Sequence, residues 1–502
     1  MHVPPCFRRA DGGKILGFQR SSGILMNISS LWGAYGIGGF GAEAVEFGRY
    51  LRSMGFTWWQ ILPMCPIGAG NSPYSGRSAF AINPLYVSPE MLAEEELLSR
   101  EELLGARYPG EPFAVDYDFA RQVKPRLLRR GYECFCRRPE AARLLRDFEE
   151  QERFWLTDYA DYMARREANG QTPWWAWDRT LPPADRSYYI FEQYILSSQW
   201  AACKKELNDM GIRIMGDMPI YVSRDSAELW AHPELFDTEE GIPTRVAGVP
   251  PDYFSADGQL WGNPLYDWQR MAQDGYMWWV RRIGRSLALC DAVRIDHFRG
   301  FHRYWAVPAG AETAKEGSWL DGPGMELFDR VRSELGEVPI VAEDLGTWDE
   351  GLAEFLERSG YPGMRVIQFG FGGGESLHMP HCYPANCVAY TGTHDNNTML
   401  GWLWETPPGE KKHLLDYCRF TGQDPLEGGP RSRVLHDIIT TLWQSAARIA
   451  ILPIQDVLGY GGDTRMNIPG EGEGNWRFRI TRESLEPTDA GFFRHLNQLY
   501  VR

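Results

Sequence analysis

The chain has 502 residues, with 52 Lys or Arg and 67 Asp or Glu, so its formal charge is −15. Hydrophobic residues make up 43% and charged residues 24%, a balance that excludes a disordered, collagen-like or coiled-coil protein. The negative charge repels polyanions, so we expect no nucleic acid partner. The aromatic content is unusual, with 20 Trp, 23 Tyr and 24 Phe.

Cysteine usage and the N-terminal sequence predict a cytoplasmic protein. Nine Cys, an odd number scattered through a long chain, fit reduced thiols better than a disulfide framework. Residues 1–9 lack the apolar stretch of a signal peptide. No window has the roughly eighteen uncharged apolar residues of a membrane span, so we expect no membrane partner.

Eight short apolar runs, most ending in a polar or glycine-rich cluster, are typical of the strands of a parallel α/β sheet. The runs are Gly23–Leu31, Phe56–Met64, Ile212–Val222, Ala292–Phe298, Pro339–Leu345, Met364–Phe371, Cys387–Thr393 and Ile449–Val457. Helical patterns follow most of them, and Ala42–Met54 has the spacing of an amphipathic helix. Eight strands with intervening helices predict a closed (β/α)8 TIM barrel rather than an open sheet.

Two connections between these strands are far too long for simple crossovers. We expect residues 65–211 to form an inserted, mostly helical subdomain, with helices over Met91–Leu104, Val123–Arg130 and Ala141–Arg153 before the Trp-rich segment Thr172–Asp178. Residues 223–290 should form a second insertion, whose loop 248–264 is rich in Pro, Gly and aromatic residues and would cover the substrate. Both would surround the C-terminal face of one catalytic barrel spanning residues 1–502, without a C-terminal β-sandwich domain.

Carboxylates close several of the predicted strands, at the end of a barrel where reacting groups lie. They are Asp217 at the third strand, Asp296 at the fourth, Glu343 at the fifth and Asp395 at the seventh. The set lacks the Cys-rich or His-rich groups that thiol chemistry or zinc binding requires. We therefore predict acid–base chemistry and no metal site.

Residues two apart on a strand face the same side, so Arg294 and Asp296 should both point into the barrel. The guanidinium would keep the carboxylate ionised, and an ionised Asp in a sheltered pocket can act as a nucleophile. A carboxyl group close to Asp296 and Asp395 resists ionising, which makes Glu343 a suitable proton donor near neutral pH. One nucleophilic carboxylate and one protonated carboxyl group are the equipment of a retaining glycosidase or transglycosidase.

Aromatic residues in or beside the predicted mouth loops fit this chemistry, because the C–H faces of sugars lie flat on indole and phenol rings. They are Trp58, Trp59, Tyr74, Tyr253, Phe254 and Trp261. Taken singly, Arg294 and Asp296 fit a structural ion pair as well as a catalytic one, and Glu343 fits a structural carboxylate. The conjunction of three acids on three strand ends, with Arg294 and His394 beside them, favours catalysis.

At these motifs the sequence resembles the amylomaltase-type 4-α-glucanotransferases, or disproportionating enzymes, a branch of the α-amylase superfamily. The resemblance extends from about Leu25 to Arg479. Four stretches are similar to the active-site strands of the superfamily: GDMPIYV, VRIDHFRG, VAEDLG and YTGTHDN. Six others are similar to this branch in particular: NSPYSGRSAF, WAHPELF, GVPPDYFS, WGNPLY, PIQDVLG and RMNIPG.

The resemblance implies a role for each matching residue. Asp296 would be the nucleophile, Glu343 the general acid/base, and Asp395 the third carboxylate, which grips the hydroxyls of the reacting sugar. The residues that would bind substrate are Tyr74, Asp217, Tyr253, Phe254, Trp261, Arg294, His394 and Asn467. The family uses no organic cofactor and no structural calcium.

The activity that the resemblance implies is transfer of α-1,4-glucan segments by double displacement. The donor would be a maltooligosaccharide or a chain of starch or glycogen, and the acceptor would be the 4-hydroxyl of a glucan or of glucose. A retaining α-glucan hydrolase of the α-amylase type is an alternative, because it would use the same three acids. A non-catalytic glucan-binding protein that has kept the barrel is another, although the intact set of acids argues against it.

Overall fold

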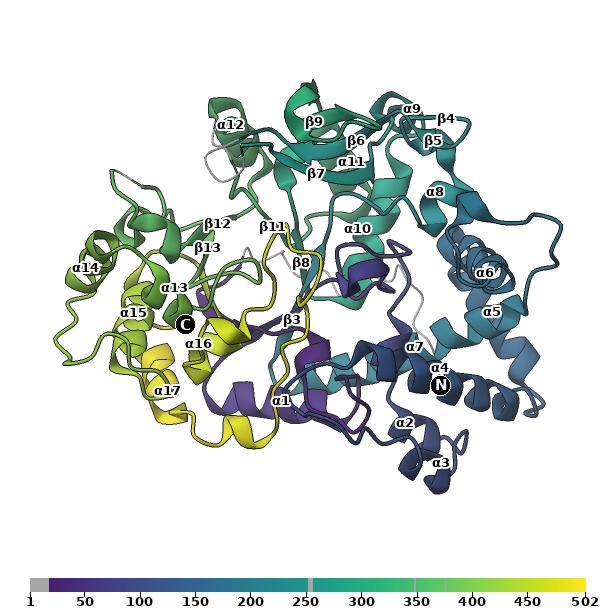
Figure 1. Cartoon of the computed structure of the whole chain (residues 1–502), viewed down its shortest axis with the longest axis horizontal. Helices are drawn as coiled ribbons and strands as arrows, with labels where there is room; N and C mark the ends of the chain where they lie inside the picture. The colour runs from purple at the N-terminus through teal and green to yellow at the C-terminus, as the bar shows by residue number, and fades with distance from the viewer. Residues whose placement is uncertain (1–17, 252–255, 347–348, 375) are drawn as a thin grey trace.

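A computed structural model describes residues 18–251, 256–346, 349–374 and 376–502. Eight parallel strands form one sheet whose order around the molecule is the order of the chain, as in a (β/α)8 barrel (Figure 1). The strands are β1 (Ser21–Leu25), β2 (Trp58–Gln60), β3 (Arg213–Met218), β8 (Ala292–Ile295), β11 (Ile340–Ala342), β12 (Gly363–Val366), β13 (Cys387–Tyr390) and β14 (Ile449–Pro453). Each predicted run overlaps one of them, so the predicted barrel is confirmed.

The barrel closes between β11 and β12, the two edges of this sheet. There the N–H of Ala342 donates to the carbonyl oxygen of Pro362 (2.9 Å). The N–H of Met364 donates to the Asp344 carboxylate (2.7 Å), which adds a side-chain link across the same gap. Asp344 therefore helps to close the barrel. This structural role differs from the one predicted for its neighbour Glu343.

The strands are shorter than the apolar runs that predicted them. The run Gly23–Leu31 is a strand only as far as Leu25, because the Asn27 side chain accepts the next backbone N–H (2.9 Å) and begins a 3-10 turn. Similar turns over Phe298–Phe301 and Ile367–Gly370 follow β8 and β12. Polar residues of the barrel mouth therefore lie at strand ends and on the turns just beyond them.

Trp58 and Trp59 on β2 are core residues, so the expectation that they line the barrel mouth is wrong. Both side chains are buried. The indole N–H of Trp58 donates to the Ser21 hydroxyl (3.2 Å), and that of Trp59 donates to the carbonyl of Met26 (2.8 Å). A strand of a closed barrel with a helical coat is covered on both faces, so its aromatic residues fill the interior instead of meeting a ligand.

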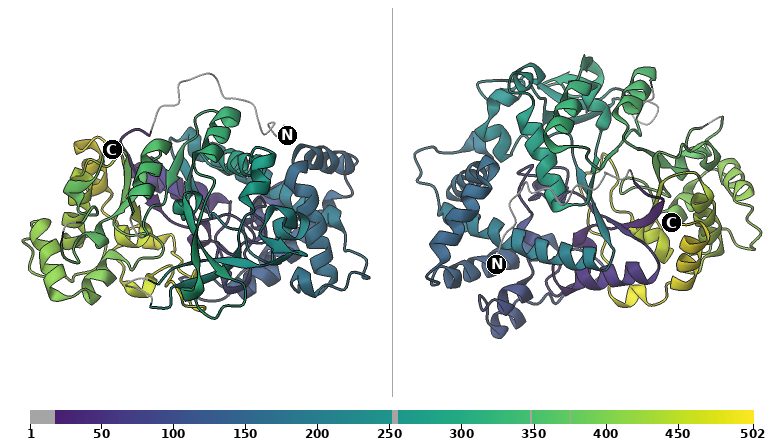
Figure 2. Two further views of the ribbon diagram at one scale, coloured as in Figure 1. Left: turned by 90° about the horizontal axis from the view of Figure 1, so that it is seen from above. Right: turned by 180° about the vertical axis from the view of Figure 1, so that it is seen from behind.

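The chain between β2 and β3 is helical and gathers on one flank of the barrel (Figures 1 and 2). Its helices are α2 (Pro89–Glu94), α3 (Arg100–Leu104), α4 (Tyr117–Phe135), α5 (Ala141–Gln151), α6 (Arg153–Ala168) and α7 (Arg186–Asp209). The last of them, α7, packs against α1 (Ala42–Ser53) and β3, as a barrel helix does. The predicted helix Met91–Leu104 is two helices, because Glu96 has φ +61° and a capping box of Ser99 and Glu102 begins α3.

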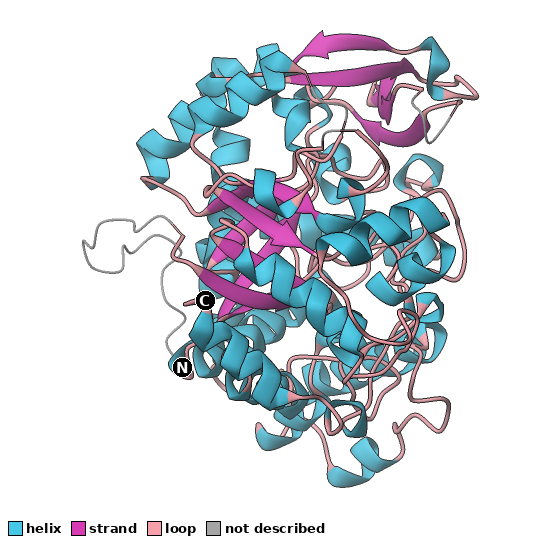
Figure 3. Cartoon of the chain, turned by 90° about the vertical axis from the view of Figure 1, so that its left-hand side faces the viewer, coloured by secondary structure: helices cyan, strands magenta, loops and turns pink. Residues whose placement is uncertain are grey.

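A four-stranded antiparallel sheet lies at the edge of the molecule, apart from the barrel strands (Figure 3). Its strands are β6 (Arg245–Val249), β7 (Gln259–Pro264), β9 (Arg303–Pro308) and β10 (Ser318–Asp321). Smaller elements precede or follow the β6–β7 hairpin: α8 (Ala227–Ala231), β4 (Thr238–Glu239), β5 (Ile242–Pro243) and α9 (Trp268–Gln273). The expected bounds 223–290 leave out half of this sheet and include α10 (Met277–Leu289), which packs on β3 and β8.

The helices near the C-terminus lie on the flank opposite the first insertion (Figure 1). In the described part of the chain, the remaining α-helices are α11 (Met325–Leu335), α12 (Glu350–Ser359), α13 (Met399–Glu405), α14 (Pro408–Tyr417), α15 (Arg433–Gln444), α16 (Ile454–Leu458) and α17 (Ala490–Leu499). Within the described ranges, no helix combines the length and the apolar character needed to cross a bilayer.

The close approach of β1 and β2 generates a stability prediction. A β-carbon at Gly23 would lie 2.5 Å from Cβ of Trp58 and 2.7 Å from its carbonyl oxygen. We expect Gly23→Ala to lower the free energy of unfolding by about 1–3 kcal/mol, because the strands have to move apart. The control is Gly409→Ala in α14, where nothing lies within 4 Å of the added carbon. Thermal unfolding should show a lower midpoint for Gly23→Ala alone, and equal midpoints would contradict this packing argument.

Candidate active site

Arg294, on β8, lies at the centre of the polar residues at the C-terminal end of the barrel. One terminal nitrogen of its guanidinium donates to both carboxylate oxygens of Asp217 on β3 (2.8 and 2.6 Å). The other donates to Asp296, directly after β8 (2.7 Å). The side chains of Arg294 and Asp217 are 4% and 0% exposed, whereas that of Asp296 is 28% exposed. Of the three, Asp296 is therefore the one that can meet a ligand.

The positive charge of Arg294 is stabilised by its two carboxylate partners. Burial alone would lower the pKa of Arg294, but Asp217 and Asp296 raise it well above its ordinary value. The guanidinium therefore stays charged and bonded to Asp296. Among the described residues, only one carboxylate oxygen of Asp296 accepts a hydrogen bond, so the other is available for chemistry.

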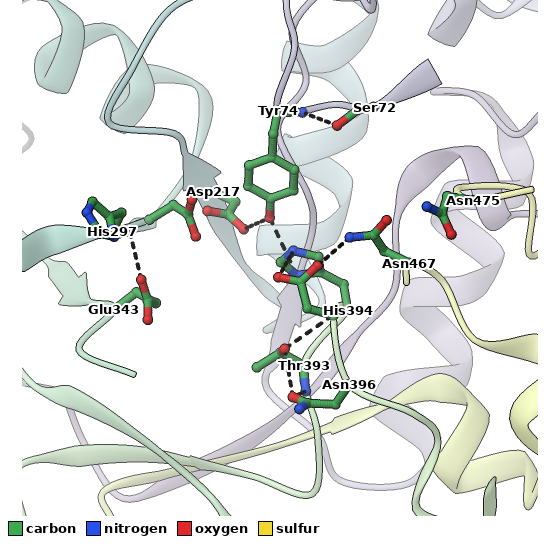
Figure 4. Close-up of polar contacts among 12 residues, drawn as sticks. Ser72, Tyr74, Asp217, His297, Glu343, Thr393, His394, Asn396, Asn467 and Asn475 are labelled. Carbon is green, nitrogen blue, oxygen red and sulfur yellow. Dashed lines mark hydrogen bonds and ion pairs between the residues drawn. The ribbon is translucent and has the colours of Figure 1, made fainter. Parts of the chain in front are cut away.

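Tyr74 and His394 form a ring stack beside the carboxylates (Figure 4). The Tyr74 hydroxyl donates to Asp217 (2.7 Å) and lies 3.4 Å from Nδ1 of His394. The two ring centroids are 4.9 Å apart and the planes differ by 16°. Trp476 adds a third ring, 5.9 Å from each of the other two. The result is an aromatic cluster adjoining the charged residues, in which Tyr74 is partly buried while His394 and Trp476 are buried.

Asp395 follows His394 on the turn after β13 and is held by a distant segment of the chain. Nε2 of His394 lies 3.2 Å from one carboxylate oxygen, and the side-chain amide of Asn467 donates to the other (2.6 Å). Arg465 donates to the backbone carbonyls of Asp395 (2.5 Å) and Asn467 (2.8 Å). Burial favours the neutral acid, but His394 and Asn467 favour the charged form and lower the pKa of Asp395 to about 2. Asp395 in turn raises the pKa of His394 against the effect of burial.

Glu343, directly after β11, has a different electrostatic environment. The backbone N–H of His297 donates to Oε2 and that of Leu345 donates to Oε1, each at 2.7 Å. Burial, followed by the negative charge of Asp296, raises the pKa of Glu343 to about 7, while the two N–H bonds act in the opposite direction. The carboxyl group is thus present in both protonation states near neutral pH, as a group that donates and then accepts a proton must be.

Trp261, on β7, is linked to the site by its contact with the ring of His297. The two rings meet edge to face, with centroids 4.8 Å apart and planes at 84°. Trp261 is 38% exposed, so part of its indole remains available to a ligand. The predicted substrate-binding residues Tyr253 and Phe254 lie outside the described residues.

A family model described as 4-alpha-glucanotransferase matches residues 26–484. The chain belongs to this family of enzymes. The 4-alpha-glucanotransferase of Thermus thermophilus is 42% identical over 96% of this chain and 99% of that protein, and that of Streptococcus pneumoniae is 40% identical over 96% and 98%. The amylomaltase from Streptococcus agalactiae, solved in complex with acarbose, superposes with a TM-score of 0.91 at 36% identity, covering 96% of this chain and 100% of that one.

The structure brings most of the predicted residues of this 4-alpha-glucanotransferase family member into one connected cluster. Linked by hydrogen bonds or ring contacts are Tyr74, Asp217, Arg294, Asp296, His394, Asp395 and Asn467, while Glu343 and Trp261 both contact His297. In the part of the chain that the structure describes, no group of three or more His, Cys, Asp or Glu side chains is placed to hold a metal ion.

Three residues of this site were not predicted from the sequence. Arg465 could have been noticed, because it lies two residues before Asn467 in the RMNIPG stretch. Trp476 gave no signal, since its contact with Tyr74 joins segments about 400 residues apart. His297 was passed over because its contribution to Glu343 is a backbone N–H, which no residue type specifies.

The buried ion pairs generate a second stability prediction. We expect Arg294→Met to lower the free energy of unfolding by about 3–5 kcal/mol, because it leaves Asp217 and Asp296 without a positive partner. The matched control is Arg49→Met on α1, where the guanidinium is 64% exposed and lies 4.0 Å from Glu206. Its loss should cost less than about 1 kcal/mol in the same unfolding experiment. Equal losses for the two variants would contradict the central position of Arg294.

Proposed function

We propose that this enzyme transfers α-1,4-glucan segments from a maltooligosaccharide, or from a chain of starch or glycogen, to the 4-hydroxyl of an acceptor glucan or of glucose. The observation that carries the proposal is a pair of carboxyl groups in opposite environments at neighbouring strand ends. Asp296 is bonded to a permanent cation, while the pKa of Glu343 is raised to about 7. A nucleophile and an acid/base of this kind are what a retaining double displacement requires.

In the first step, the free carboxylate oxygen of Asp296 attacks the anomeric carbon of the donor. The glycosidic bond breaks, and Glu343 gives its proton to the departing oxygen. In the second step, Glu343, now ionised, takes the proton of the acceptor 4-hydroxyl, whose oxygen attacks the same carbon and releases Asp296. Two inversions retain the α configuration.

The remaining residues would hold the sugar at the reaction centre. Because the pKa of Asp395 is about 2, this side chain is an ionised acceptor for sugar hydroxyls throughout the working range. Its negative charge also favours the positive charge that develops on the sugar ring in the transition state. The partly buried ring of Tyr74, which stacks on His394, would offer an apolar face against which the sugar ring can lie.

We further propose that the two insertions cover the bound glucan. The exposed part of Trp261, on the β6–β7 hairpin, supports this role, since the ring reaches the residue next to Asp296. A cover that excludes water leaves a sugar hydroxyl as the second nucleophile. This is the physical difference between a transferase and the alternative, a retaining α-glucan hydrolase with the same acids.

Incubation with maltotriose alone tests the proposed function directly. We expect maltooligosaccharides longer than the substrate to appear together with free glucose, because each transfer lengthens one chain and shortens another. Chromatography of the products over time provides the measurement. Maltose and glucose in equal amounts, without longer products, would instead support the hydrolase.

Replacing the reacting carboxyl groups should abolish turnover without loss of the fold. We expect Asp296→Asn and Glu343→Gln each to lower the transfer rate by roughly 10³-fold or more, since each removes a group that forms a bond or moves a proton. The matched control is Asp118→Asn on α4, whose side chain is fully exposed and lies 3.9 Å from Arg121. Circular dichroism should be the same for all three variants. Activity of either active-site variant within tenfold of the parent would refute its role.

The raised pKa of Glu343 makes a prediction for the pH profile. Glu343 must be protonated to act as the acid, so kcat/KM for maltotriose should fall as the pH rises through about 7. A glucosyl fluoride donor needs no proton on its leaving group, so the first step with such a donor should lose this basic limb. A basic limb at the same pH with both donors would contradict the assignment of Glu343 as the acid.

A further inference from the structure

His297, the residue directly after Asp296, has a left-handed backbone with φ +50° and ψ +48°. This conformation costs energy for any residue other than Gly, and it persists where the surrounding structure imposes it. Here the surroundings are the end of β11. The N–H of Phe298 donates to the backbone carbonyl of Glu343 (3.1 Å), and the N–H of Glu343 donates to the carbonyl of Ile295 (3.0 Å).

The left-handed conformation of His297 turns two successive N–H groups toward Glu343: that of His297 donates to Oε2 of the side chain (2.7 Å; Figure 4), and that of Phe298 donates to the main-chain carbonyl. Residues 297 and 298 together therefore bind both the side chain and the main chain of Glu343. If His297 adopted the usual right-handed or extended backbone, the N–H groups of His297 and Phe298 would diverge, and Glu343 would lose one of the two bonds. The strained residue thus determines where the Glu343 carboxyl group lies relative to Asp296.

The imidazole of His297 is packed on several sides. Trp261 meets it edge to face at 4.8 Å, and the ring of Tyr221 lies 6.5 Å away. Gly300 leaves room for it, since a β-carbon there would lie 3.3 Å from Cδ2 of His297. Burial lowers the pKa of His297 to about 4. The ring is therefore neutral near pH 7 and contributes packing rather than proton transfer.

We propose that His297 is a positioning residue, whose left-handed backbone aims the Glu343 carboxyl group and whose ring connects that group to Trp261 on the β6–β7 hairpin. A glucan that contacts Trp261 would thereby also affect the position of Glu343. The substrate would be covered and the proton donor oriented in the same step. The inference rests on the proposed function, because it takes Glu343 as the acid/base.

Substitutions that separate the backbone of His297 from its ring test the first part. Asn tolerates the left-handed region, whereas Ala disfavours it and the β-branched Val disfavours it strongly. We expect His297→Val to lower kcat by roughly 100-fold, as a displaced catalytic group does, and His297→Ala to have a smaller effect in the same direction. His297→Asn should stay within about tenfold of the parent.

The pH profile separates this role from a general loss of structure. The N–H bond favours ionised Glu343, while burial and Asp296 oppose ionisation and Arg294 favours it. Loss of the bond in His297→Val or His297→Ala should therefore move the basic limb of kcat/KM to higher pH, and His297→Asn should leave it in place. If His297→Val does not fold, the comparison of His297→Ala with His297→Asn decides. Identical limbs in all folded variants would overturn the proposal.

The connection to the hairpin is tested by a double-mutant cycle with Trp261→Ala and His297→Gly. Gly keeps the left-handed backbone but has no ring for Trp261 to hold. We expect Trp261→Ala to lower kcat in the parent but to leave kcat unchanged in the His297→Gly background, while its effect on KM is the same in both. Equal effects on kcat in the two backgrounds would overturn the connection. A parent enzyme that does not disproportionate maltotriose would instead refute the proposed function, so the two failures are distinguishable.

Discussion

The ion pairs of Arg294 with Asp217 and Asp296 determine the electrostatics of the barrel mouth. A guanidinium buried at this depth requires carboxylate partners. Asp217 lies on β3 opposite Arg294 in the sheet, and Asp296 directly follows β8. The bond to Arg294 also fixes the position of one carboxylate oxygen of Asp296. The charge of Asp296, added to burial, then raises the pKa of Glu343 to about 7. One cation thus holds the carboxylate of Asp296 in place, and that carboxylate in turn helps Glu343 to carry a proton near neutral pH.

Asp395 and Glu343 show how partners, and not burial alone, assign the roles of carboxyl groups. Burial acts on both in the same direction, yet the pKa of Asp395 is lowered to about 2 and that of Glu343 is raised to about 7. His394 and Asn467 contact Asp395, whereas the charged neighbour that acts most strongly on Glu343 is the anion Asp296. In the proposed reaction, this separation lets one group bind hydroxyls as an anion while the other moves a proton.

The sequence predicted the parts of this enzyme that depend on local pattern. All eight strands could be located, because a buried parallel strand is a short apolar run, and the two-residue spacing of Arg294 and Asp296 correctly placed them together. Trp58 and Trp59 of β2 were wrongly expected at the barrel mouth. An apolar run that is buried on both faces has the same sequence pattern as one that ends at a ligand. The second insertion, expected over residues 223–290, was bounded without β9 and β10, because β6 pairs with β9 although the barrel strand β8 lies between them in the chain. The left-handed turn at His297 follows from contacts between β8 and β11 and has no local signature.

The central claim is that Asp296 forms a covalent bond with the transferred glucan while Glu343 moves the proton. It can be tested by mixing the Glu343→Gln variant with α-maltotriosyl fluoride, a donor that leaves without a proton, and digesting the quenched protein for mass spectrometry. The maltotriosyl group should attach to the protein. Its release should be slow, since no base remains to activate an acceptor. We predict a maltotriosyl group on the peptide that contains Asp296. The same group on a different carboxylate, or release of fluoride with no labelled peptide at any time, would contradict the account.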